Sequence, residues 1–107
     1  MVPVILSLLS IVLLLPVQSG QSFNGTITDA MCPRADHSRM RMGANDAECA
    51  IACADAHGAV YVLYDGKETY VLSDQKASEK FAGKAVIVTG TRDAKNMTIQ
   101  VSSIVPR

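Results

Sequence analysis

Apolar residues alternate with polar ones, or run together briefly, in five stretches of the chain, and this pattern predicts five β-strands. The clearest alternation is at residues 22–29, where Phe23, Gly25 and Ile27 share one face. We expect Gly25 to mark a bend or bulge, because glycine inside a strand often does. The other predicted strands are residues 59–64, 68–72, 84–91 and 97–104.

Turn residues pair four of these strands into two hairpins. Asp65-Gly66 joins the second predicted strand to the third, and this dipeptide is the strongest short hairpin signal. The segment 92–96 joins the last two strands. The sequence therefore predicts two antiparallel strand pairs.

The last predicted strand contains a break in its alternation. Met97, Ile99 and Val101 share one face, whereas Ile104 is out of phase with them. A bulge at Ser102-Ser103 would restore the register, because it adds one residue to one strand of a pair.

A helix is predicted at residues 46–57, which are rich in alanine. Asn45 is a good N-cap, Glu48 follows three residues later as in a capping box, and Gly58 supplies the C-cap. A shorter helix is predicted after the cap at residues 73–74 and runs to Phe81.

The order of elements predicts the fold class. One strand is followed by a helical insert, two strands, a short helix and two more strands. Five strands with a helix between the third and fourth is the order of the OB-fold, a small Greek-key barrel. We therefore predict a mainly β, five-stranded OB-like barrel with a helical insert between strands 1 and 2. The alternative is a five-stranded open sheet with two helices.

The first stretch of the chain predicts export. Residues 1–17 are apolar except for Ser7 and Ser10 and carry no charged side chain, which suits the hydrophobic part of a signal peptide. We expect cleavage after Ser19 and a periplasmic or secreted domain at 20–107, with no stable membrane insertion afterwards. The alternative is an uncleaved anchor.

The charge balance and the cysteine content limit which partners and which cysteine pairings are possible. Ten Lys and Arg balance ten Asp and Glu, which argues against a nucleic-acid partner, because phosphate binding usually requires a basic surface. An exported protein meets an oxidising compartment, yet three cysteines cannot all pair within one chain.

Nearly all of the metal-binding chemistry lies in one insert, residues 31–58. It contains all three cysteines, both histidines and three of the five methionines. Thiolate, imidazole and thioether groups bind copper and zinc, and the methionines favour copper before zinc. The candidate metal ligands are Cys32, His37, Met40, Met42, Cys49 and Cys53.

The two helical cysteines and the two histidines differ in how well they fit a metal site. Cys49, Cys53 and His57 are spaced by four along one helix face, but C-x3-C is not the C-x2-C of zinc ribbons. His57 fits better as a cap at the helix C-terminus. His37 is the better ligand candidate, and Asp36 beside it could orient its ring.

A disulfide is the alternative use of the same cysteines. Cys32 could pair with Cys49 or Cys53, closing a loop that contributes about 3 kcal/mol to stability. The methionines would then pack the insert onto the barrel. Thiol redox catalysis fits the helical spacing poorly. We therefore predict a binding or structural module and not an enzyme.

A further possibility is ligand binding on the barrel face. OB-folds bind their ligands on a strand surface with aromatic side chains, and Tyr61, Tyr64 and Tyr70 lie on the first predicted hairpin. The expected partner is then a peptide, a glycan or a protein.

Several segments together resemble a family of small exported bacterial proteins of unknown function with OB-like barrels and a Cys/His/Met insert. The segments are FNGTITDAMC, ADHSRMRMG, ECAIAC, YVLYDGKETYVLSDQ, FAGKAVIVTGT and TIQVSSI. The resemblance covers nearly all of residues 20–107 and implies the fold and export, but no activity.

Overall fold

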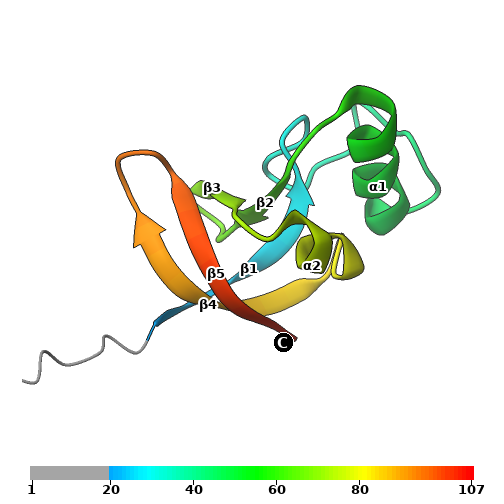
Figure 1. The fold of residues 1–107 in the computed structure, drawn as a ribbon. Coiled ribbons are helices and arrows are strands. Elements are labelled where there is room, and N and C mark those ends of the chain that lie inside the picture. Colours follow the sequence, from blue (N-terminus) through cyan, green and yellow to red (C-terminus); the bar gives the residue numbers. More distant parts are fainter. Residues whose placement is uncertain (1–19) are drawn as a thin grey trace, which may run out of the picture.

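The structure is a computed structural model that describes residues 20–107, so the predicted signal peptide lies outside the described residues. The fold is mainly β, with five strands and two helices in the predicted order (Figure 1). In chain order the elements are β1 (Gln21–Asp29), α1 (Asp46–His57), β2 (Tyr61–Tyr64), β3 (Thr69–Leu72), α2 (Gln75–Lys80), β4 (Ala85–Asp93) and β5 (Thr98–Pro106).

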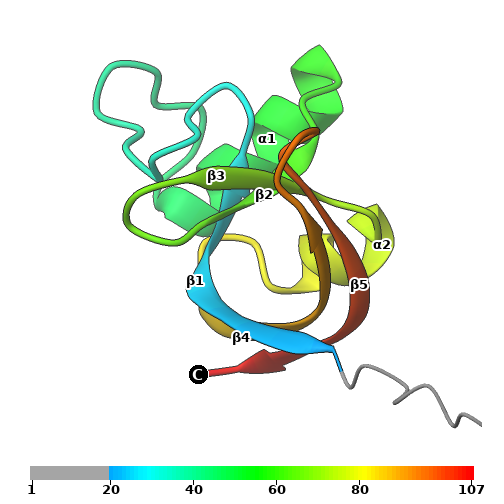
Figure 2. The ribbon, with the colours of Figure 1, turned by 90° about the vertical axis from the view of Figure 1, so that its left-hand side faces the viewer.

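Hydrogen bonds join the five strands into a ring with the order β1-β2-β3-β5-β4, in which β4 pairs with β1 again (Figure 2). The β3–β5 pair is parallel and the other four pairs are antiparallel, so the sheet is mixed. Both predicted hairpins, β2–β3 and β4–β5, are confirmed. The alternative of an open sheet is wrong, because every strand has two hydrogen-bonded neighbours.

Gly25 lies where β1 passes from one neighbour to the other. β1 pairs with β4 up to Thr26 and with β2 from Thr26 onward. A Cβ atom at Gly25 would lie 2.5 Å from the backbone oxygen of Tyr64. Glycine is therefore required here because the two strands approach too closely for a side chain.

The predicted bulge in the last strand is confirmed. Thr89 of β4 pairs with Ser103, and Gly90 pairs with Val101, so Ser102 has no partner on β4. A Cβ atom at Gly90 would overlap the backbone oxygen of Gln100. The bulge and this close contact together shape the β4–β5 pair.

Inward side chains from all five strands form the core, to which α1 contributes Ala50. The buried members are Ile27, Ala50, Tyr61, Leu63, Tyr70, Leu72, Ala82, Val86, Val88 and Ile99. Helix α1 packs against β1, and α2 packs against β2. No helix within residues 20–107 has both the length and the hydropathy required to cross a membrane.

Both caps of α1 are as predicted. The Asn45 side chain accepts a hydrogen bond from the Glu48 backbone N–H at 2.9 Å, while the Glu48 carboxylate accepts from the Ala44 N–H at 2.9 Å. Gly58 ends the helix with a φ of 66°, a left-handed conformation that glycine adopts without strain. The capped helix buries Cys49 and Cys53 on the face toward β1.

Candidate metal centre

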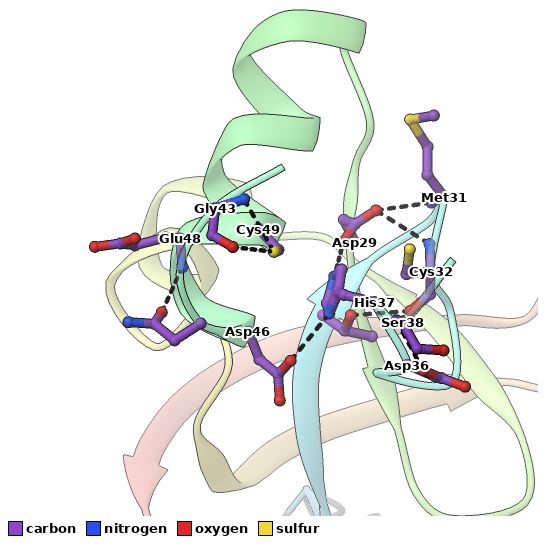
Figure 3. Close-up of polar contacts among 12 residues, drawn as sticks. Asp29, Met31, Cys32, Asp36, His37, Ser38, Gly43, Asp46, Glu48 and Cys49 are labelled. Atoms are coloured by element: carbon purple, nitrogen blue, oxygen red, sulfur yellow. Dashed lines mark hydrogen bonds and ion pairs between the residues drawn. The ribbon is translucent and has the colours of Figure 1, made fainter. Parts of the chain in front are cut away.

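Asp29, the last residue of β1, forms the centre of a buried polar cluster. Its side chain is fully buried, and its Oδ2 atom accepts hydrogen bonds from the backbone N–H groups of Met31, at 3.0 Å, and Cys32, at 3.1 Å. Its Oδ1 atom lies 2.8 Å from Nε2 of His37 (Figure 3). The carboxylate therefore holds the turn after β1 and the histidine ring together.

Local sequence explains why Cys32 is held at this turn. An aspartate side chain commonly accepts hydrogen bonds from the backbone two and three residues later, as Asp29 does here. The neighbouring Thr28 hydroxyl donates to the Cys32 backbone oxygen at 3.0 Å. Two side chains from the end of β1 thus fix the backbone of Cys32, whose side chain is only 7% exposed.

His37 is buried, and one of its ring nitrogens has no hydrogen-bond partner. In the tautomer with the proton on Nε2, this nitrogen donates to the Asp29 carboxylate and the lone pair lies on Nδ1. Nδ1 is buried without a hydrogen bond, 3.4 Å from Oδ1 of Asp46. A histidine that donates one ring N–H to a carboxylate and keeps its other nitrogen free is the usual arrangement at protein metal sites.

Asp29, Cys32 and His37 together could hold a metal ion. One potential ligand atom from each of the three buried residues lies within 4.8 Å of the other two. Ligands of one tetrahedral zinc ion, at bond lengths of about 2.0 to 2.3 Å, lie about 3.3 to 3.8 Å apart. The most widely separated of these atoms would therefore have to approach by about 1 Å to share an ion.

The two helical cysteines lie behind this group and are not part of it. Cys49 and Cys53 are fully buried on α1. The Cys49 sulfur accepts from the Gly43 N–H at 3.1 Å and donates to the Gly43 oxygen at 3.2 Å, so it already has partners (Figure 3). The three-residue group includes Cys32 and His37 from the predicted ligands, but neither helical thiol.

Burial keeps two of the thiols protonated. It is the main cause that raises the pKa of Cys32 and of Cys53, and the negative charge of Asp29 is the second cause for both. A thiol binds metal as its thiolate, so binding at Cys32 requires the release of a proton. The positive charge of the ion would favour that release.

The disulfide that we considered is not formed in this structure. All three cysteines are free thiols. Cys32 is fixed by the turn after β1, and Cys49 is hydrogen-bonded to Gly43. The pairings of Cys32 with Cys49 or with Cys53 are therefore absent.

Several other predicted residues lie away from the buried group. Met40 and Met42 are each 40% exposed, and His57 is exposed in the last turn of α1. The expected role of Asp36 is corrected, because its carboxylate accepts from the Ser38 N–H at 3.0 Å, and Asp29 orients the ring of His37.

The three tyrosines do not form one exposed face. Tyr61 and Tyr70 are each 5% exposed and belong to the core, whereas Tyr64 is half-buried. Of the three, only Tyr64 leaves an appreciable part of its side chain to a ligand.

Asp29 is the site residue that the sequence pattern did not identify. The alternation of apolar and polar residues places it at the end of the first predicted strand and indicates no chemical role for it. A usable signal was present, because an aspartate at a strand end three residues before a cysteine predicts a carboxylate-capped turn at that cysteine.

Comparisons of the chain with protein-family models, with curated proteins and with solved structures gave no match.

Proposed function

We propose that this protein is a small exported binding module that holds one soft metal ion, copper before zinc, and is not an enzyme. The observation that carries the proposal is the buried group of Asp29, Cys32 and His37, whose ligand atoms lie within 4.8 Å of one another. The Nδ1 atom of His37 is buried without a hydrogen bond and lies 3.4 Å from Oδ1 of Asp46, a carboxylate that could hold an ion together with this nitrogen. A buried polar atom without a partner is costly, and an ion would satisfy it.

Cys32 and His37 are the proposed ligands from the loop after β1. Asp29 serves as a third ligand or as the carboxylate that fixes the ring of His37, and both roles raise metal affinity. Any further thiolate would have to come from Cys49 or Cys53, which are buried on α1 outside the three-residue group.

The choice of metal follows from the donor atoms. Nitrogen, oxygen and sulfur ligands together suit zinc or copper and disfavour magnesium and calcium. The thiolate of Cys32 is the soft donor of the group, and Cu(I) prefers thiolate ligands. Copper is therefore the first metal to test.

Different observations support the proposed OB-like fold and the proposed export of the protein. The strand order β1-β2-β3-β5-β4, with α2 between β3 and β4, supports the OB-like assignment. The resemblance to small exported bacterial proteins, together with the apolar residues 1–17, supports export.

The test is metal binding by the purified protein under reducing, oxygen-free conditions. We expect native mass spectrometry after incubation with Cu(I), and separately with Zn(II), to show one tightly held ion per chain. His37→Gln and Cys32→Ser should each lose most of that binding. The matched control is His57→Gln, which alters the exposed histidine at the end of α1.

Two results would contradict the proposal. One is a wild-type protein that retains neither ion. The other is equal metal retention by His37→Gln and His57→Gln, because binding would then not depend on the buried histidine.

A further inference from the structure

A surface hollow of about 480 Å³ lies directly beside the buried metal-binding group. Its walls come from the loop after β1, and they include Met31, Cys32, Arg34, Asp36, Arg39 and Met40. Cys32 belongs both to this hollow and to the buried group. The hollow therefore borders on one of the proposed metal ligands.

The walls of the hollow are tied to the buried group by hydrogen bonds. The Met31 and Cys32 N–H groups donate to the Asp29 carboxylate, and the Met40 N–H donates to the His37 backbone oxygen at 3.2 Å. Two of the proposed metal-binding residues thus hold the backbone of three residues that line the hollow.

Three residues that line the hollow carry sulfur, namely Met31, Cys32 and Met40. Met31 and Met40 are each 40% exposed, although methionine is an apolar residue that usually packs inside. Cys32 is 7% exposed, whereas Cys49 and Cys53 are fully buried. Of the three thiols, Cys32 is therefore the one that an ion in the hollow can reach.

Charge at the hollow indicates the form in which the metal arrives. Arg34 and Arg39 outnumber Asp36 on the walls, which favours an anionic species at the mouth of the hollow. An anionic complex, in which Cu(I) is already bound by a negatively charged carrier, would be attracted. The recognised species is then the complex and not the free ion.

We propose that this hollow is the entry site through which Cu(I) passes from an anionic complex to Cys32, with Met31 and Met40 as transient thioether ligands. This inference rests on the proposed function of the buried group. The transfer is ligand exchange without a change of oxidation state. Bonds from copper to the carrier break, bonds to the thioether sulfurs and then to the Cys32 sulfur form, and the S–H proton of Cys32 passes to water.

The test is the rate of copper transfer from the anionic Cu(I)–bicinchoninate complex, followed by stopped-flow absorbance without oxygen. We expect the double variant Met31→Leu/Met40→Leu to load copper several-fold more slowly than wild type while reaching the same final stoichiometry. The matched control is Met42→Leu, because Met42 is 40% exposed in the same insert but does not line the hollow. It should load at the wild-type rate.

The possible outcomes separate this inference from the proposed function. Equal rates for wild type and both variants would overturn the entry site and leave the buried metal site standing. A lower final stoichiometry in the double variant would also overturn it, because the methionines would then be permanent ligands. Failure of the wild type to take up copper would overturn the entry site, and only a wild type that also retains no zinc would overturn the proposed function as well.

Discussion

At the scale of single residues, Asp29 determines how the candidate centre is built. The chain contains a second aspartate with the same turn geometry, Asp93 at the end of β4, whose Oδ1 atom accepts from the Lys95 and Asn96 N–H groups at 3.0 and 3.2 Å. Asp93 is exposed and has no histidine beside it in the described structure. Substitutions of Asp29 and Asp93 therefore distinguish the effect of losing a turn from the effect of losing the metal site.

We predict that Asp29→Asn lowers metal affinity by about 10- to 100-fold, the usual cost of losing a carboxylate that orients a histidine ligand. The amide is similar in shape but cannot supply the charge. Affinity would be measured by competition with a chelator of known strength. Asp93→Asn is the control and should bind like wild type. Equal affinities in the two variants would contradict a role for Asp29 in the metal site.

Tyr61 has a buried hydroxyl without a hydrogen-bond partner. Burial is the main cause that raises the pKa of Tyr61 from 10.0 to about 12, with smaller contributions from the charges of Glu79, Asp55 and Asp29. The folded protein therefore holds the phenol proton more tightly than the unfolded chain does. The stability that this proton confers is complete below pH 10 and is lost as the pH rises toward about 12.

We predict that Tyr61→Phe leaves the free energy of unfolding at pH 7 unchanged or slightly higher, because the lost hydroxyl has no partner. Between pH 10 and about 12, the variant should lose less stability than wild type does. Urea unfolding at a series of pH values would measure both effects. Tyr64→Phe, at a half-buried position, should keep the wild-type alkaline decline.

At the scale of elements, α1 depends on its cap. Asn45 satisfies the Glu48 N–H, which would otherwise lack a partner at the start of the helix. We predict that Asn45→Ala lowers the free energy of unfolding by about 1 kcal/mol. Urea unfolding at pH 7 would measure the loss. Glu79→Ala, at an exposed position in α2, is a suitable control, and an equal loss in both variants would contradict a specific capping effect.

The elements also show which features could be read from the sequence. The bounds of α1 were predicted because its caps are local signals carried by Asn45, Glu48 and Gly58. Strand ends differ by one or two residues, since pairing with distant strands decides them. The link from Asp29 to His37 could not be read, because it depends on how an irregular loop returns to the end of β1.

At the scale of the whole molecule, the closed ring of strands requires close backbone contacts. The alternation of side chains predicted the strands and their bulge, but ring closure depends on β4 returning to β1, which no local pattern specifies.

Gly90 makes one of the close backbone contacts of the ring, with the backbone of Gln100. We predict that Gly90→Ala costs about 1 to 3 kcal/mol of stability, as overpacking does. Thr91→Ala at the exposed neighbouring position is the control for thermal unfolding, and equal melting temperatures would contradict a requirement for glycine.

Metal binding and folding stability should be coupled, because the ligands come together only when the end of β1 and the loop after it are folded. An ion present at 100 times its dissociation constant stabilises the folded state by about 2.7 kcal/mol, provided that it does not bind the unfolded chain. For a domain of this size, that free energy raises the melting temperature by about 10 to 20 °C. The measurement is thermal unfolding of reduced protein with and without Cu(I) or Zn(II).

The same measurement separates the metal site from a disulfide-stapled domain. A metal-dependent rise that a chelator reverses, and that His37→Gln lacks, is the expected result. Reducing agent alone should not lower the melting temperature, because the three cysteines are free thiols. A melting temperature that falls on reduction and does not respond to metal would show instead that a disulfide stabilises the insert, and the buried Asp29–His37 pair would then be structural.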